Sequence, residues 1–328
     1  MSAAHLDPHA QHMRVHPVIR HYEPPAGWQE SILSAMLRTS LRVSLKPFLG
    51  PPWPFAVQRF ALAAGSAFMP QDGRALVRKV QMADYPAERV TPKAGPKPRH
   101  AILYLHGGAF VCGSPRTHRS ITRRLSALTG AEVLVPEYRL APEARFPTQI
   151  NDCVTAYRQL LADGYAPERI AIAGDSAGGN LTFMTSIALR MARLPAPAVL
   201  VMMSPVVSNH PLPSNTLAER EPRDPMIRIA WAQDIERALL IKPDHPLADP
   251  MAQDMSELPP SLIQVGDDEV LYDSSTWLAG AATAAGRTCE LEVYMKRWHV
   301  FQAHAGLLPS SDRALERQAA FMKRHWAA

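Results

Sequence analysis

The chain has 328 residues and a mass of 36.2 kDa, enough for one large α/β unit or two ordinary domains. Hydrophobic residues make up 47% of it and charged residues 20%, which excludes wholesale disorder and collagen-like repeats, and the 31 prolines argue against a coiled coil. The formal net charge of +5 comes from basic residues spread along the chain, so we expect no nucleic-acid partner.

The sequence predicts no integral membrane span. Its longest candidate, residues 60–69, is about half as long as a bilayer requires. Residues 1–20 carry four histidines and lack the apolar core of a signal peptide. The three cysteines have neither paired nor metal-like spacing: Cys112, Cys153 and Cys289. We therefore expect a cytoplasmic protein.

Two amphipathic helices are predicted in the first 72 residues. The first begins at Gln29, and its apolar side is expected to carry Ile32, Leu33, Met36, Leu37 and Leu41. A proline-rich break at 50–54 must end it. The second helix shows helical spacing of Val57, Phe60, Ala61, Ala64 and Phe68. Neither helix has a strand partner nearby, so we interpret residues 1–72 as a helical cap segment.

After residue 73 the pattern changes to short apolar runs that alternate with helical segments. This alternation is typical of a mostly parallel sheet with helices on both faces, and the first two strands are expected to form an antiparallel edge. We predict eight strands, near residues 77–82, 89–91, 101–105, 132–136, 170–173, 198–203, 261–265 and 291–295. These belong to a second domain at 73–328.

One segment interrupts that alternation. Residues 208–250 contain several prolines around a single helical stretch at 227–240. An insertion between two strands, at the carboxyl edge of the sheet, is where a lid would lie. We therefore interpret 208–250 as a cap or lid insertion in the second domain.

The most specific motif is Gly174-Asp175-Ser176-Ala177-Gly178, which follows the apolar run 170–173 and precedes a helix-compatible segment. A serine in G-x-S-x-G at a strand-to-helix turn is the pattern of a nucleophile elbow, in which the hydroxyl is exposed above the sheet. The start of the helix adds backbone N–H groups and a positive dipole end. The pentapeptide alone would also suit a glycine-rich turn that binds phosphate. With the next motif, the sequence predicts Ser176 as a nucleophile.

That second motif is His106-Gly107-Gly108-Ala109-Phe110, directly after the apolar run 101–105. Attack on an ester carbonyl places negative charge on its oxygen, and backbone N–H groups can reach that oxygen only where no side chain blocks the approach. Two consecutive glycines meet this need. The amides of Gly107 and Gly108, together with that of Ala177, are predicted to form an oxyanion hole.

With three further motifs in the same order, the sequence resembles the hormone-sensitive-lipase group of α/β hydrolases, the bacterial family IV carboxylesterases, over about residues 75–325. These motifs are Tyr138-Arg139-Leu140-Ala141-Pro142-Glu143, Asp224-Pro225-Met226 and the run from Leu258 to Gly266. The resemblance implies an α/β-hydrolase fold and a serine carboxylesterase that acts on short- to medium-chain esters without a metal or organic cofactor. Ala109 stands where many relatives have a third glycine, which is expected to shape the acyl side of the pocket.

A serine hydroxyl is a weak nucleophile, so a histidine must take its proton during attack. In this fold the chain order is serine, acid, histidine, which restricts the base to His299, His304 or His325. His299 follows the last predicted strand within a few residues, where the resemblance places the base. We expect the other two histidines to lie at the surface.

The acid is expected in the cluster that follows the run 261–265. There the family pattern D-x-L-x-D aligns with residues 269–273, which makes Glu269 the predicted acid and Asp268 the alternative. A glutamate suits this role, because the acid orients the imidazole and stabilises its charged form. For Asp267 and Asp273, helix capping is the simpler interpretation.

Other functions would use the same residues. An amidase, a formamidase or a lactonase needs the same machinery, and the sequence does not separate them from an esterase. A ligand-binding protein that retains the fold without turnover would be expected to lose a member of the triad. The expected partner is a small-molecule ester, and the sequence leaves a homodimer open.

Overall fold

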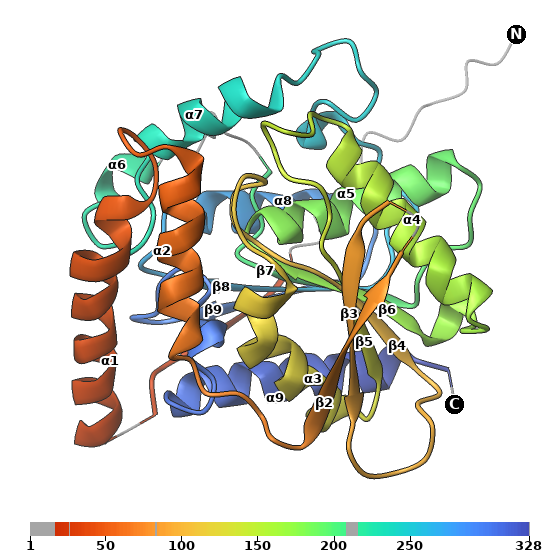
Figure 1. Ribbon diagram of the computed structural model, residues 1–328, viewed down its shortest axis with the longest axis horizontal. Coiled ribbons are helices and arrows are strands. Elements are labelled where there is room, and N and C mark those ends of the chain that lie inside the picture. The colour runs from red at the N-terminus through yellow and green to blue at the C-terminus, as the bar shows by residue number, and fades with distance from the viewer. Residues whose placement is uncertain (1–16, 26, 83, 208–215, 328) are drawn as a thin grey trace, which may run out of the picture.

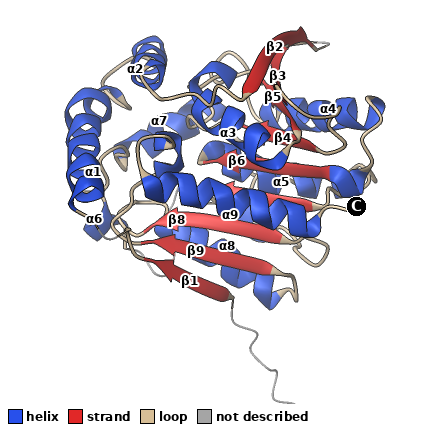
Figure 2. Ribbon diagram, turned by 90° about the horizontal axis from the view of Figure 1, so that it is seen from below, coloured by secondary structure: helices blue, strands red, loops and turns tan. Residues whose placement is uncertain are grey.

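The computed structural model describes residues 17–25, 27–82, 84–207 and 216–327. In this part of the chain the core is a sheet of nine strands in the order β1-β9-β8-β7-β6-β4-β5-β3-β2 (Figures 1 and 2). β2 pairs antiparallel with β3, as does β3 with β5, and the other pairs are parallel. The strands are β1 (Val18–Tyr22), β2 (Ala75–Gln81), β3 (Pro86–Pro92), β4 (Ala101–Leu105), β5 (Glu132–Pro136), β6 (Ile170–Asp175), β7 (Val199–Met203), β8 (Ser261–Gly266) and β9 (Cys289–Tyr294). The predicted mostly parallel α/β fold is confirmed.

The sequence predicts eight of these strands and misses β1. This edge strand pairs parallel with β9, and all but the last of its residues are exposed, so its sequence carries no apolar alternation. Side chains also attach it, since Tyr22 stacks on Tyr294 with ring centroids 5.1 Å apart and Arg20 forms an ion pair with Glu290. The segment predicted as a cap therefore also supplies a strand to the sheet.

Helices cover both faces of the sheet. α4 (Thr148–Ala162), α5 (Ala177–Met191) and α8 (Tyr272–Ala284) pack on one face, while α3 (Arg119–Thr129) and α9 (Pro309–His325) pack on the other (Figure 2). The central strands are therefore buried on both faces and consist of nearly continuous apolar runs. Within the described residues, none of the helices is long and apolar enough to cross a membrane.

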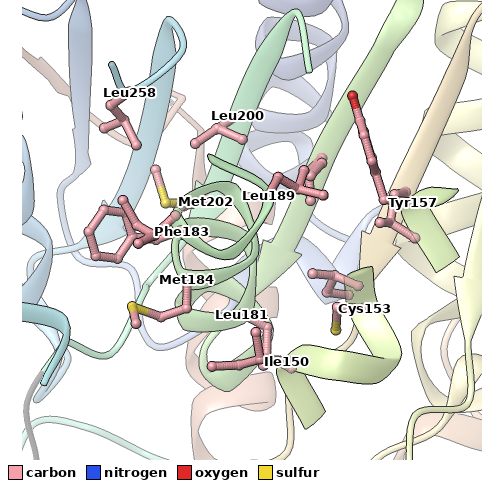
Figure 3. Close-up of a cluster of buried hydrophobic side chains, with 14 of the residues drawn as sticks. Ile150, Cys153, Tyr157, Leu181, Phe183, Met184, Leu189, Leu200, Met202 and Leu258 are labelled. Atoms are coloured by element: carbon pink, nitrogen blue, oxygen red, sulfur yellow. The ribbon is translucent and has the colours of Figure 1, made fainter. Parts of the chain in front are cut away.

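Alternate residues of each central strand enter different apolar clusters. In β4, Leu103 contributes to the cluster beneath α4 and α5, whereas Ile102 contributes to the one beneath α3 and α9. Figure 3 shows part of the first cluster, in which Ile150 and Cys153 of α4 lie beside Leu181 of α5. Each such buried aliphatic side chain stabilises the fold by roughly 1.5–3 kcal/mol. The packing holds the carboxyl ends of the strands at fixed positions.

A separate layer of helices lies over the carboxyl ends of the strands. It comprises α1 (Trp28–Ser40), extended by a π-helical turn (Leu41–Leu45), together with α2 (Phe55–Ala67), α6 (Leu217–Arg220) and α7 (Ala230–Leu239), all toward the left of Figure 1. An apolar cluster that includes Leu45, Leu49, Trp231 and Ile235 joins this layer to the loops after β4 and β5. α7 matches the helical stretch predicted in the insertion, and residues 208–215 of that insertion lie outside the described residues.

The apolar faces predicted for α1 and α2 are only partly right. Leu37 packs against the sheet-side cluster around Trp298, but Ile32 is 51% exposed and Met36 is 64% exposed. In α2, Phe60 is 74% exposed. The apolar residues of both helices cover a wider arc than the contact surface, so helical spacing alone does not show which part of the arc is buried.

Candidate active site

Ser176 lies on the turn between β6 and α5, and its backbone adopts φ 55° and ψ −119°. A non-glycine residue rarely adopts a positive φ, and such strain is characteristic of functional sites. The flanking glycines make the turn possible, since a Cβ at Gly174 would lie 2.3 Å from the carbonyl oxygen of Gly178 and one at Gly178 would lie 1.9 Å from that of Leu105. The turn predicted from the pentapeptide is present.

Ser176 lines a cavity of about 100 Å³ between the sheet and the helical layer. Most of its wall is apolar, and two of the wall residues, Trp231 and Ile235, come from α7. The remaining wall includes Ala109, Phe110, Ala177, Val206, Leu217, Ile227, Val270 and Leu271. The cavity is therefore bounded by the helical layer on one side and by the loops of the sheet on the other.

The predicted acid and base lie side by side. Glu269 follows β8 and His299 follows the adjacent strand β9, and both side chains are buried. Nδ1 of His299 is 3.8 Å from Oε2 of Glu269, a distance at which the two groups attract each other without a direct hydrogen bond. Contacts of this kind are often long before substrate binds. The structure thus brings Glu269 and His299 together.

Ser204, at the end of β7, joins this pair to the serine turn. Its hydroxyl donates a 2.9 Å hydrogen bond to Oε2 of Glu269 and accepts one of 3.5 Å from the Val300 amide. The preceding residue, Met203, accepts a 2.8 Å bond from the Ser176 amide. Ser204 has a positive φ of 48°, and no motif in the sequence predicts its role. Its only sequence signal is its position directly after a buried strand.

The electrostatic environment favours a protonated His299. Burial lowers the pKa of His299, but the neighbouring Glu269 carboxylate, together with the charges of Asp224 and Asp175, raises it. The net effect is a pKa above the ordinary histidine value. A base held in this way is stabilised when it accepts a proton.

Asp268 does not face His299. Its carboxylate lies 2.9 Å from the guanidinium of Arg38 in α1 and 3.6 Å from the guanidinium of Arg223 in the insertion. Of the two acids that the sequence leaves open, the structure places only Glu269 beside the imidazole.

The oxyanion loop differs from the prediction. The Gly107 amide already donates a 3.1 Å hydrogen bond to Oδ1 of Asp175, so it is not free to bind a substrate oxygen. In the described part of the chain, no acceptor is found for the amides of Gly108 and Ala109. Gly108 has φ +115°, and a Cβ there would lie 2.4 Å from the carbonyl oxygen of Cys112. The free amides thus begin one residue later than predicted.

Comparison with known proteins agrees with this geometry. A family model described as alpha/beta hydrolase fold matches residues 102–303. An acetyl-hydrolase of Streptomyces hygroscopicus is 39% identical over 224 residues, covering 68% of this chain and 75% of that protein. An esterase of Acinetobacter venetianus is 32% identical over 295 residues, covering 89% and 94%. The crystal structure of an esterase from the bacterial hormone-sensitive lipase family has a TM-score of 0.83 at 33% identity and covers 92% of this chain and 99% of its own.

The chain belongs to the bacterial hormone-sensitive-lipase family of α/β hydrolases. The resemblance drawn from its motifs is therefore confirmed. As a member of this family the chain is a carboxylic ester hydrolase.

In this hydrolase a buried polar network supports the oxyanion loop. Asp175 accepts a 2.6 Å hydrogen bond from the Tyr104 hydroxyl and lies 3.2 Å from Nε2 of His118. The Tyr138 hydroxyl donates a 2.7 Å bond to the carbonyl oxygen of His106. Burial, with the nearby His118, lowers the pKa of His106 to about 3, so its ring stays neutral. The network fixes the backbone of the loop.

The hydrolase also buries a histidine that was expected at the surface. His304 is only 4% exposed and lies edge-on to Trp298, with ring centroids 5.5 Å apart. Burial lowers the pKa of His304 to about 4. It belongs to a short 3-10 helix (Phe301–His304) that packs inward, a feature that sequence spacing did not reveal.

Proposed function

We propose that this hydrolase cleaves short- to medium-chain carboxylic esters through an acyl-enzyme intermediate formed on Ser176. The observation that carries the proposal is the buried pair of Glu269 and His299, which Ser204 links to the strand end that binds the strained serine turn. The backbone amides near Ser176, the cavity and the helical layer each have a role in the proposed reaction.

In the first half of the reaction, Oγ of Ser176 attacks the carbonyl carbon while Nε2 of His299 takes the hydroxyl proton. The tetrahedral intermediate collapses, the bond to the leaving oxygen breaks, and His299 gives its proton to the departing alcohol. Water then attacks the acyl-enzyme with His299 as base again, and the acid product leaves. Glu269 orients the imidazole through Nδ1 and stabilises its positive charge.

The oxyanion of both tetrahedral intermediates is proposed to bind the amides of Gly108, Ala109 and Ala177. The first two have no acceptor in the described part of the chain, and the third begins α5, where the helix dipole is positive. Each such donor typically contributes about 3 kcal/mol to transition-state stabilisation. Gly107 supports the loop through Asp175 instead.

The size of the cavity beside Ser176 limits the acyl chain. Its volume of about 100 Å³ is smaller than the roughly 150 Å³ of a cavity that holds a benzene ring. A volume of this size favours short acyl groups over long ones. We therefore place the preference at the short end of the proposed range.

The helical layer is proposed to act as a cap. α7 supplies Trp231 and Ile235 to the cavity wall, and α2 and the π-helical extension of α1 join the same apolar cluster. The cap would then combine the N-terminal helices after β1 with the insertion at 208–250, and residues 73–328 would form the catalytic domain.

Replacement of Ser176 by alanine tests the proposal. The variant is expected to lose roughly 10⁶-fold in kcat on p-nitrophenyl butyrate while its circular dichroism spectrum stays unchanged. Mass spectrometry of the wild-type enzyme, quenched during turnover, should show the acyl adduct on Ser176. Retention of a tenth of the activity in the variant would remove Ser176 from the mechanism. Parallel assays with an anilide and a lactone separate an esterase from an amidase or lactonase.

A further inference from the structure

Helix α1 touches both loops that carry the proposed acid and base. Arg38, in its last turn, donates a 2.9 Å hydrogen bond to Oδ2 of Asp268, the residue before Glu269. The same guanidinium nitrogen donates a 3.1 Å bond to the carbonyl oxygen of Lys296, three residues before His299. The other nitrogen donates a 3.0 Å bond to the carbonyl oxygen of Arg223 in the insertion. One side chain thus joins the acid loop, the base loop and the insertion.

A second contact fixes the other end of the same helix. Glu30, in the first turn of α1, forms a buried ion pair of 2.5 Å with Arg297, two residues before His299. Ser34 accepts a further 3.2 Å hydrogen bond from Arg297. Both ends of α1 are therefore attached to the base loop, the first turns through Glu30 and Ser34 and the last turn through Arg38. A rotation or shift of α1 would move that loop.

The relative position of the acid and the base depends on these loops. Glu269 and His299 are 3.8 Å apart and share no direct hydrogen bond, so neither side chain holds the other in place. The backbones of the two loops meet through the Asp268 amide, which donates a 3.0 Å bond to the carbonyl oxygen of Arg297. Arg38 reinforces this junction from outside, and its guanidinium lies 5.3 Å from the centre of the Trp298 ring.

We propose that α1 is a positioning element of the active site, and that Arg38 is a positioning residue which sets the separation between Glu269 and His299. This inference rests on the proposed function of those two residues. The planar fork of arginine suits the role, because it bonds in several fixed directions at once, whereas a lysine offers a single charged point. Arg38 is not among the residues that line the cavity beside Ser176.

Arg42 provides a matched control. It lies one turn further along the same helical segment and donates hydrogen bonds of 3.1 Å and 3.2 Å to the carbonyl oxygens of Pro222 and Arg223. It shares with Arg38 the positive charge and the contact with the insertion. Its hydrogen bonds do not reach the acid loop or the base loop. Arg42→Gln therefore reports the loss of a cap contact alone.

The test compares Arg38→Gln, Arg38→Lys and Arg42→Gln on p-nitrophenyl butyrate. Arg38→Gln is expected to lower kcat roughly 10- to 100-fold with KM within twofold, because small displacements of catalytic groups cost rate rather than binding. Arg38→Lys should recover part of this loss. Arg42→Gln should stay within twofold of the wild type in both constants.

The pH profile provides a readout that a general loss of stability would not change. The charged groups near His299 are Glu269, Asp224 and Asp175, and the largest raising effect on its pKa comes from Glu269. A larger separation of Glu269 from His299 would weaken that effect, so the acid limb of kcat/KM in Arg38→Gln should move to lower pH. The limb should not move in Arg42→Gln.

The outcomes separate the two proposals. Inactivity of the wild type on esters, or full activity of Ser176→Ala, would overturn the proposed function. An active wild type in which Arg38→Gln matches Arg42→Gln in kcat and in pH profile would overturn the positioning role. If Arg38→Gln does not fold, Asp268→Asn breaks the same ion pair from the other loop without changing α1. It should then lower kcat and shift the limb in the same direction, and an unchanged kcat would overturn the inference.

Discussion

The two sides of the active site are held in different ways. On the sheet side, central strands that are buried on both faces end directly at the serine turn and at the acid and base loops. On the helical side, long cationic side chains bind carbonyl oxygens across the interface: Lys46 binds those of Glu221 and Asp224, Arg59 those of Val111 and Ala141, and Arg228 those of Leu49 and Pro51. Apolar packing positions the catalytic loops on the sheet side, whereas the helical layer is attached both by the apolar clusters around Trp231 and Trp298 and by these polar contacts.

Among the changes that compare the two sides, substitution of the acid should give the largest effect, because the acid lies on the sheet side. Glu269→Gln is expected to lower kcat by about 10⁴-fold, since the amide no longer stabilises the imidazolium or selects its tautomer. Asp268→Asn keeps the Glu269 carboxylate beside His299 and should lose about tenfold in kcat, because it breaks the contact with Arg38. Steady-state kinetics on one ester compare the two variants. A harmless Glu269→Gln would reverse the assignment of the acid.

The next largest effect concerns the stability of the contact between α1 and the base loop. Glu30→Ala leaves the Arg297 guanidinium buried without its partner, which should lower the free energy of unfolding by about 3–5 kcal/mol. The double variant Glu30→Leu with Arg297→Met removes both charges and should be more stable than the single variant. Urea denaturation measures all three proteins. A double variant that is no more stable than Glu30→Ala would show that the unpaired charge of Arg297 is not what destabilises the single variant.

The pH dependence of wild-type activity reports on His299, whose pKa is affected by acidic groups from both sides of the site. His299 must be neutral to act as base, and its pKa is raised by Glu269 from the sheet side and by Asp224 from the insertion. The acid limb of kcat/KM should therefore lie above the ordinary histidine value of about 6.5, with activity lost as the pH falls through it. Asp224→Asn should move the limb to lower pH. A wild-type limb below 6.5 would contradict this electrostatic picture.

Features that depend on local sequence patterns could be predicted, whereas features that depend on contacts between distant segments could not. The central strands and the serine turn follow from local apolar runs and from glycine spacing, and the sequence predicts both. β1 was missed because an exposed edge strand needs no apolar pattern. The Gly107 amide is not available as an oxyanion donor because it binds Asp175, which lies on a neighbouring strand 68 residues away in the sequence. Arg38 binds the backbone carbonyl oxygen of a residue 185 positions away. Because every residue type has a backbone carbonyl, this contact leaves no signal in the sequence.

The smallest effect is expected at the exposed edge of the helical side. Arg59 and Glu143 form an ion pair of 2.7 Å, but their side chains are 32% and 63% exposed, so the pair stabilises the fold by only about 0–1 kcal/mol. The hydrogen bond from Arg59 lowers the pKa of Glu143 from 4.5 to about 2. The contribution is therefore present above pH 4.5 and is lost as the pH falls toward 2.

Glu143→Gln removes this ion pair alone, because the bonds from Arg59 to the carbonyl oxygens of Val111 and Ala141 do not involve the carboxylate. Urea denaturation at pH 7 should show a loss of less than about 1 kcal/mol, and the difference from the wild type should shrink as the pH is lowered. Arg59→Ala should cost more, since it also removes the carbonyl contacts that attach α2. If Glu143→Gln were as damaging as Arg59→Ala, surface charge rather than carbonyl binding would hold the helical layer in place.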